Sequence, residues 1–238
     1  MVKDLIIEKN YLENIKKCQV LGKGMFAHVY RLNEEEAIKI YYDKTYPILK
    51  VEPLLNVKNY PSNFTLPKQL VYLKEVYTEK VIGYIMNYAK GIHLRDYDKI
   101  NFDDYLKAII NLKHSLEEFS LTLIQMNDVH EGNILFNANG ENSEFNFIDA
   151  DRWEVDNKAS EKSILRTNTI KIVATIGEKF LEEDYIKLNK ALLKMYEYYA
   201  IDSFDWLCEL LNSLKENLEN QYEFKIENMG DMVNILRG

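Results

Sequence analysis

Short runs of apolar and β-branched residues, separated by turn signals, dominate the first part of the chain. These runs are rich in Val, Ile and Tyr, and glycines or Asn-Glu clusters divide the first three of them. They lie at 17–22, 27–33, 36–42, 69–74 and 80–88. Runs of this length and composition are typical of β-strands joined by tight connections. The pattern predicts five strands, with one irregular helix at 45–59 between the two groups.

Beyond residue 100 the apolar positions follow the spacing of helices. Apolar residues recur at steps of three and four over the segment 102–125, which predicts a long amphipathic helix. Two further helices are expected at about 178–199 and 204–219. The Asn139-Gly140 pair lies between two short apolar runs and predicts a hairpin. The charged segment 156–170 is expected to be a surface loop.

Length and composition fit one domain of two lobes, or two small domains, with a substantial core. The chain has 238 residues, of which 47% are hydrophobic. Lys and Arg number 30 against 38 Asp and Glu, a net charge of −8, which argues against a nucleic-acid-binding face. No apolar run approaches the roughly 20 residues that span a bilayer. Neither a nucleic-acid partner nor a membrane partner is therefore expected.

Cysteine usage and the N-terminal residues favour a cytoplasmic protein. The two cysteines, Cys18 and Cys208, lie far apart and match no disulfide framework or zinc motif. The first residues lack the long apolar segment of a secretory signal. A reducing compartment is the expectation that follows.

A glycine-rich segment joins the first two predicted strands and is a candidate phosphate-binding loop. It contains Gly22, Lys23 and Gly24, followed by Ala27 and Val29. Glycines at these positions let backbone N–H groups approach a phosphate where a Cβ would obstruct it. The alternative interpretation is an ordinary hairpin whose glycines serve its turn.

A lysine on the third predicted strand is a candidate contact for the same phosphates. Strand alternation places Ala37, Lys39 and Tyr41 on one face, and a lysine on a buried face needs an anionic partner. An ATP phosphate and a carboxylate would supply that partner, whereas a solvated edge lysine would need neither. A partner carboxylate is expected after the strand, and Glu52 is the only acidic residue between Lys44 and Lys74.

The segment that follows the last predicted strand is a candidate site for the adenine ring. Met86, Asn87 and Tyr88 open a link between the sheet and the helices, up to Gly91. Backbone groups of Asn87 and Tyr88 would contact the adenine edge, and Met86 would line its pocket.

Three polar residues in the second half of the chain match the needs of phosphoryl transfer. Asp128 precedes Asn133 by five residues, and Asp149 follows an apolar strand sixteen residues after Asn133. Transfer from Mg-ATP requires a carboxylate at the acceptor hydroxyl, with an amide and a carboxylate at the metal. The alternative for Asp128 and Asn133 is a turn stabilised by side-chain caps.

In order and spacing these motifs resemble those of the protein-kinase-like superfamily, over nearly the whole chain up to about residue 155. The matching segments are Leu21-Gly-Lys-Gly24, Ala37-Ile-Lys39, Asp128-x4-Asn133 and Asp149. The resemblance implies an α+β, two-lobed protein-kinase-like fold. Its N-lobe (1–87) would be a five-stranded antiparallel sheet, and its reduced C-lobe (88–238) would be mainly helical.

The resemblance also implies roles for these residues. Asp128 would be the catalytic base or orient the acceptor hydroxyl, and Lys39 would contact the α- and β-phosphates of ATP. Asn133 and Asp149 would hold Mg²⁺. His130 is either a phosphate contact or a hydrogen-bonded loop residue.

Several positions depart from the protein-kinase pattern. Met126-Asn127 replaces the His-Arg pair before the catalytic aspartate, and Asp149-Ala150-Asp151 replaces Asp-Phe-Gly. Asp151 is either a further metal ligand or a cap. His130 resembles the histidine of aminoglycoside and choline phosphotransferases. No proline follows Pro67, so the Ala-Pro-Glu element that anchors peptide substrates is absent.

Three functions remain open on these grounds. The first is a kinase that transfers the γ-phosphate of Mg-ATP to Ser or Thr of a protein. The second applies the same chemistry to a small metabolite or antibiotic. The third is a pseudokinase that acts as a binding module.

Overall fold

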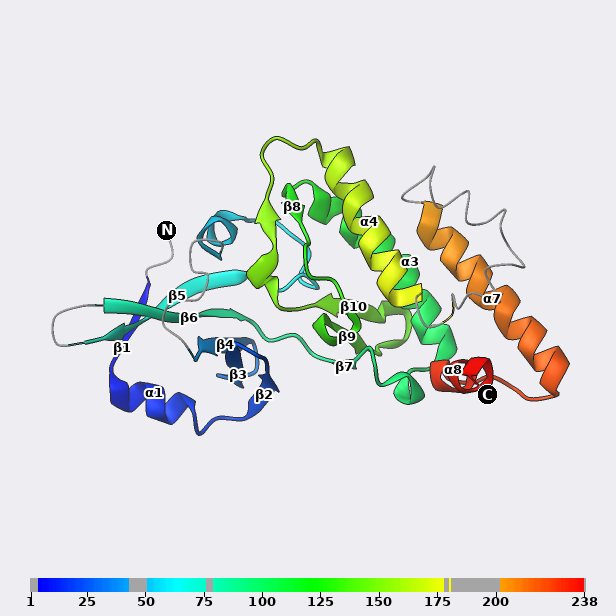
Figure 1. The fold of residues 1–238 in the computed structure, drawn as a ribbon, viewed down its shortest axis with the longest axis horizontal. Coiled ribbons are helices and arrows are strands. Elements are labelled where there is room, and N and C mark those ends of the chain that lie inside the picture. The colour runs from blue at the N-terminus through cyan, green and yellow to red at the C-terminus, as the bar shows by residue number, and fades with distance from the viewer. Residues whose placement is uncertain (1–3, 43–50, 76–78, 178–179, 181–201, 238) are drawn as a thin grey trace.

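The computed structural model describes residues 4–42, 51–75, 79–177, 180 and 202–237. The chain is α+β, with a mixed sheet formed by the N-terminal part and helices formed by the C-terminal part. The blue-to-cyan strands lie to one side of the molecule and the green-to-red helices to the other (Figure 1). We call residues 4–87 the sheet region and residues 92–237 the helical region. No helix in the described part of the chain is long and apolar enough to cross a membrane.

The main sheet has six strands rather than the five expected. In spatial order they are β1 (Leu5–Ile7), β5 (Pro67–Lys74), β6 (Glu79–Asn87), β4 (Glu36–Tyr41), β3 (Ala27–Arg31) and β2 (Val20–Lys23). The five strands that the pattern predicted are all present and pair with one another in antiparallel fashion. The additional strand, β1, pairs in parallel with β5. Its three residues are too few to give a period of two, which is why the pattern missed it.

The two faces of β4 are buried against different neighbours. Ile38 and Ile40 pack with the short helix α1 (Lys9–Ile15) through Leu12 and Ile15. Ala37 and Tyr41 belong to a second apolar cluster on the opposite face. The alternation predicted for this strand is therefore confirmed, and it directs Lys39 away from α1.

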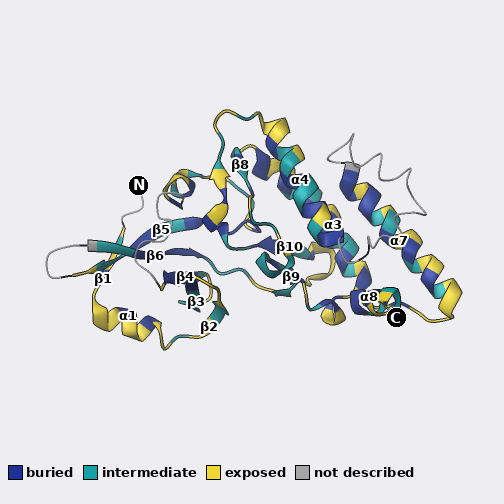
Figure 2. Cartoon of the chain, in the orientation of Figure 1, coloured by how far each residue is buried: buried dark blue, intermediate teal, exposed yellow. Residues whose placement is uncertain are grey.

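Four helices build the helical region among the described residues. They are α3 (Phe102–Ser120), α4 (Glu161–Gly177), α7 (Asp202–Tyr222) and α8 (Met229–Arg237). In α3 the apolar residues that predicted the helix are buried, except that Leu106 is partly exposed. Asn101 caps the start of the helix by accepting from the N–H groups of Asp103 and Asp104. Exposed residues gather on α1 and at the end of α7, away from this core (Figure 2).

Short strands and single turns connect these helices to the sheet. The strands are β7 (Ile92–His93), β9 (Ile134–Asn137) and β10 (Glu144–Phe147) in one sheet and β8 (Ile124–Gln125) and β11 (Glu154–Val155) in another. The 3-10 turns are η1 (Glu52–Asn56), η2 (Tyr97–Lys99), η3 (Glu131–Asn133), η4 (Gly140–Asn142) and η5 (Ala150–Arg152). The predicted hairpin is β9–β10, with Asn139-Gly140 in its loop.

Other expectations need correction. The helix predicted to run to residue 125 ends at Ser120, because Leu123 adopts a positive φ of 59° and Ile124 enters strand β8. The segment 156–170, expected to be a loop, contains the first half of α4. The helix expected at 204–219 is confirmed within α7, whereas the one at 178–199 falls outside the described residues apart from Phe180.

Polar residues on the buried face of α4 explain why this helix was not predicted from the sequence. Its buried residues follow helical spacing, but Asn168 and Thr169 stand among the isoleucines on that face. A buried face that carries two polar residues interrupts the apolar periodicity from which a helix is recognised.

Gly83 sets how closely β6 approaches β4. A Cβ at this position would lie 1.9 Å from the carbonyl oxygen of Lys39. We therefore expect Gly83→Ala to lower the free energy of unfolding by about 3 kcal/mol, because the strands must separate. Urea denaturation measures this loss. Gly22→Ala, where nothing lies within 4 Å of the added methyl group, is the matched control and should stay within about 0.5 kcal/mol of wild type.

Candidate functional site

Lys39 is a buried cation at the junction of the sheet region and the helical region. Its side chain is only 7% exposed, and it forms ion pairs with both Asp149 and Asp151, about 110 positions further along the chain. The distance from Nζ to Oδ2 of Asp151 is 2.8 Å. Burial by itself lowers the pKa of the ammonium group, but attraction to the two carboxylates outweighs burial and raises it. Lys39 is therefore held as a charged group.

Asp151 is the more enclosed of the two carboxylates. Its Oδ2 faces Lys39, and its Oδ1 accepts from the hydroxyl groups of Tyr41, at 3.0 Å, and Tyr84, at 2.8 Å. The side chain is 10% exposed. Burial, together with the adjacent Asp151 charge, raises the pKa of Tyr84 well above its ordinary value, so its hydroxyl remains a donor. Each carboxylate oxygen of Asp151 thus has a partner.

The strand register explains why these side chains meet. Lys39 on β4 is paired directly with Tyr84 on β6, and Tyr41 lies two residues further along the same face of β4. Side chains at such positions point to one side of a sheet at neighbouring spacing. Asp151 approaches that side from the turn η5.

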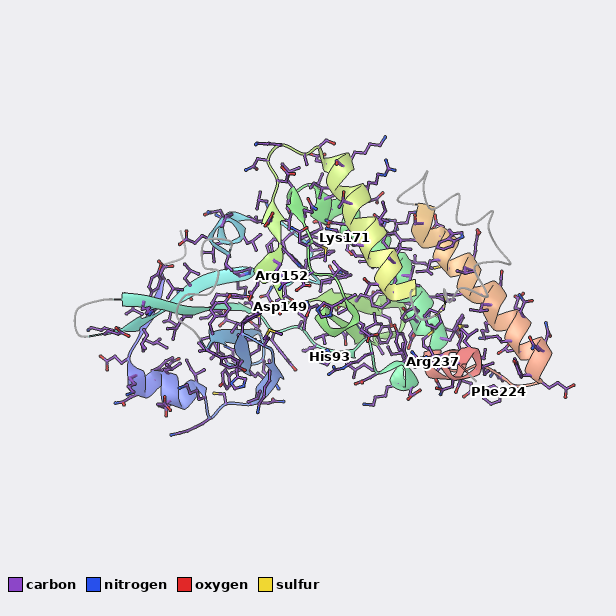
Figure 3. The ribbon with its side chains drawn as sticks, in the orientation of Figure 1. His93, Asp149, Arg152, Lys171, Phe224 and Arg237 are labelled. Carbon is purple, nitrogen blue, oxygen red and sulfur yellow. The ribbon has the colours of Figure 1, made fainter. Side chains whose placement is uncertain are left out.

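Asp149 occupies a strained position at the end of β10. Its φ and ψ are 65° and 66°, in the left-handed region, and it immediately precedes η5. The side chain is 40% exposed, so one oxygen can meet a ligand while Oδ1 contacts Lys39. Figure 3 shows Asp149 and Arg152 between the strands and the helices. A non-glycine residue in this conformation is uncommon and is often found at functional sites.

The loop from Asp128 to Asn133 is closed by its own hydrogen bonds. The side-chain amide of Asn133 donates to the carbonyl of Asp128 at 3.1 Å, and its backbone N–H donates to the carbonyl of His130 at 2.8 Å. His130 accepts from the Gly132 N–H through Nδ1 at 3.1 Å. The Asn133 carbonyl also accepts from the Ile148 N–H, which brings the loop beside Asp149.

Asp128 has a cationic neighbour at the same junction. Nε of Arg152 lies 3.7 Å from its Oδ2, and both side chains are partly open to solvent. Arg152 directly follows Asp151, so the turn η5 contributes residues to two ion pairs. A pair this exposed adds little to stability but places a positive charge next to Asp128.

Helix α4 holds the strand that leads into this loop. The side chain of the fully buried Asn168 accepts from the Met126 N–H and donates to the Ile124 carbonyl, both at 2.9 Å. Lys171 donates to the Met126 carbonyl at 2.7 Å and to Oδ1 of Asn127 at 3.0 Å. Burial lowers the pKa of Lys171. These two residues position the loop and were not among the predicted site residues, because α4 itself was not foreseen.

The glycine-rich segment forms the end of the β2–β3 hairpin. Gly24 donates its N–H to the Ala27 carbonyl at 2.9 Å and accepts at its own carbonyl from the Tyr42 hydroxyl at 3.2 Å. A Cβ would meet nothing within 4 Å at Gly22 and only the Ala27 carbonyl, at 3.7 Å, at Gly24, and the Gly24 N–H is already used within the hairpin. Lys23 is exposed.

Apolar residues that the sequence assigned to the nucleotide site, including Met86 of the predicted adenine pocket, lie in one cluster. The buried members include Ala27, Ala37 and Met86, and Val29 and Tyr88 pack against them. This cluster is on the same face of the sheet as Lys39. The structure therefore brings together the apolar residues and the lysine that the sequence placed in one site.

Two details differ from the predicted site. Glu52, at the start of η1, is exposed, and in the described part of the chain the carboxylates that pair with Lys39 are Asp149 and Asp151 instead. The N–H of Tyr88 already donates to the Glu35 carbonyl at 2.8 Å, and Asn87 pairs with Glu36 in the sheet. The Tyr88 N–H is thus not free to contact an adenine edge.

The donor set fits a magnesium ion held by few protein ligands. Over the described ranges, no group of three or more His, Cys, Asp or Glu side chains is placed to hold a metal. Asn133 and Asp149 nevertheless carry an amide oxygen and a carboxylate, and the bond from the Ile148 N–H to the Asn133 carbonyl brings their two segments together. Mg²⁺ commonly takes one or two protein ligands and completes its shell with water and substrate phosphates.

Comparison with known proteins identifies no relative of this chain. The sequence matches no protein-family model and no curated protein.

Asn168 offers a test of how the loop is positioned. Asn168→Ala removes two hydrogen bonds from buried backbone groups, and we expect the free energy of unfolding to fall by about 2–4 kcal/mol. Asn111→Ala is the matched control. Asn111 also donates to two backbone carbonyls, of Glu141 and Ser143, but it is partly exposed, so water can replace it and a loss of about 1 kcal/mol is expected. Equal losses in denaturant unfolding would contradict a special role for Asn168.

Proposed function

We propose that this protein is an ATP- and Mg²⁺-dependent phosphotransferase with a two-lobed, protein-kinase-like arrangement. Residues 1–87 would form the nucleotide-binding lobe and residues 88–238 the lobe that holds the catalytic loop. The contact of Lys39 with Asp149 is the observation that carries the proposal, because it joins the two candidate ligands of one nucleotide across the junction of the two regions. Asp128 and Asn133 lie in a loop bonded to the same strand end.

In the proposed reaction each residue acts on a defined atom. Lys39 binds oxygens of the α- and β-phosphates, and the end of the β2–β3 hairpin that contains Gly22 and Gly24 would lie over the phosphates. Asn133 and Asp149 would hold Mg²⁺, which would neutralise phosphate charge when bound. Asp128 orients the acceptor hydroxyl and takes its proton. The bond from the γ-phosphorus to the bridging oxygen breaks, a bond to the acceptor oxygen forms, and ADP leaves.

We propose Ser or Thr of a protein as the acceptor. Arg152 supports an acceptor that carries negative charge near its hydroxyl, since its guanidinium group lies beside Asp128. A small metabolite or antibiotic is the second candidate, favoured by His130 and by the lack of proline after Pro67. A pseudokinase is the third, and it is disfavoured because Lys39, Asp128, Asn133 and Asp149 are all present.

The proposal includes a cytoplasmic setting. Cys18 and Cys208 are both free thiols, as expected in a reducing compartment that also supplies ATP.

Transfer of label from γ-labelled Mg-ATP tests the proposal. We expect wild-type protein to produce ADP and to label protein hydroxyls, and Asp149→Ala to abolish both because a metal ligand is lost. Asp128→Ala should lower the rate about 10²- to 10⁴-fold, the usual contribution of a positioned acid or base. Asp205→Asn, which removes only a surface partner of Lys113, is the control and should behave as wild type.

Each outcome assigns one function. ADP formed with label on protein supports a protein kinase, and ADP formed only after metabolites are added supports a small-molecule kinase. Nucleotide that binds but stays intact supports a pseudokinase. Full activity in Asp149→Ala would show that the site is wrongly assigned.

A further inference from the structure

The second carboxylate that pairs with Lys39 comes from a segment that the sequence did not predict. A partner for Lys39 was expected from the segment after β4, and Glu52 is the only acidic residue between Lys44 and Lys74. Glu52 is exposed, and Asp151 from η5 lies 2.8 Å from the ammonium group instead. The partner therefore belongs to the same turn as Asp149.

We propose that Asp151 is the positioning residue that holds Lys39 at the phosphate site, in place of a carboxylate from the sheet region. Tyr41 and Tyr84 orient Asp151, so the four side chains form one unit, which we call the Lys39–Asp151 anchor. This inference rests on the proposed function, because the purpose of the anchor is to present Lys39 to a nucleotide.

The two aspartates differ in a way that assigns them different tasks. Asp149 is 40% exposed, whereas Asp151 is 10% exposed and has partners on both oxygens. A carboxylate that binds a metal must be accessible to solvent and substrate. A carboxylate that positions another side chain must keep the same hydrogen-bond partners. Asp149 can therefore turn to the metal while Asp151 keeps the lysine in place.

The tyrosines make the position of Asp151 specific. Their hydroxyl groups come from two adjacent strands, β4 and β6, and both donate to Oδ1. A hydrogen bond to a carboxylate in a buried site is stronger than one between neutral groups. Together they leave Oδ2 for Lys39, so the geometry of the ion pair is determined by the sheet.

The anchor has a consequence for control of the site. Where the carboxylate that pairs with such a lysine lies on a mobile helix, displacement of that helix breaks the ion pair. Here Lys39, Tyr41 and Tyr84 belong to one sheet, and Asp151 belongs to the turn that carries Asp149. The lysine is thus positioned before nucleotide binds, without any element moving into place.

A double-mutant cycle on the nucleotide-free protein tests the anchor independently of activity. Lys39→Met, Asp151→Asn and the double variant are unfolded in urea. We expect the effect of the double variant on the unfolding equilibrium constant to differ about tenfold from the product of the two single effects. The reason is that each single variant leaves a buried charged group without its partner. The parallel cycle of Lys39→Met with Glu52→Gln should be additive. Additivity for Asp151, or coupling with Glu52, would overturn the proposal.

Single hydroxyl deletions provide a milder set of variants if Asp151→Asn does not fold. Tyr41→Phe and Tyr84→Phe each remove one hydrogen bond to Asp151. Tyr105→Phe is the matched control, because it removes a buried hydroxyl bonded to the Ile176 carbonyl at 2.7 Å, away from Lys39. We expect the first two variants, and not the third, to weaken Mg-ATP binding severalfold in calorimetry. Equal binding by all three would overturn the proposal.

The same measurements separate failure of the anchor from failure of the proposed function. A wild-type protein that binds no Mg-ATP overturns the proposed function, and with it the role of the anchor, even if the cycle shows coupling. A wild-type protein that transfers phosphate, with an Asp151→Asn variant whose KM for ATP and kcat are unchanged, overturns the anchor alone. The expected result is a KM for ATP raised about tenfold or more in that variant.

Discussion

A buried positive charge is the constraint on which this structure depends. An unpaired ammonium group as enclosed as that of Lys39 would lose its hydration without compensation, so carboxylates must come to it. Both of its partners come from the turn around η5. The ion pairs of this one lysine therefore fix where the helical region contacts the sheet region. The remaining candidate site residues are arranged around that place.

The strand that delivers the two aspartates is fixed by further contacts. Beside it, the N–H of Phe147 donates to the Asn63 carbonyl, and the N–H of Thr65 donates to the Phe147 carbonyl. The ring of Phe64 stacks between those of Phe119 and Phe147, with centroids 3.9 Å and 5.2 Å away. The segment just before β5 thus packs both on β10 and on the long helix α3. Backbone pairing and aromatic packing together limit where the end of β10 can lie.

The loop that contains Asp128 is positioned from the other side by α4. Asn168 binds backbone groups of Ile124 and Met126, and Lys171 binds the Met126 carbonyl and the side chain of Asn127. These contacts hold the strand that leads into the loop. They require polar residues on α4, and the buried amide of Asn168 is stable there because its oxygen and its NH₂ group each have a partner.

Local features of this protein were determined by its sequence alone. Strand alternation assigned Lys39 to the face of Ala37, helical spacing located α3 and α7, and the β9–β10 hairpin followed from its turn residues. Each of these depends on neighbours within a few positions, which leave a periodic signal. The partner of Lys39, by contrast, was decided by tertiary structure, because a contact between residues 110 positions apart leaves no period. The same holds for β1, whose pairing is remote, and for α4, whose buried Asn168 is explained by the backbone groups of Ile124 and Met126 that it binds.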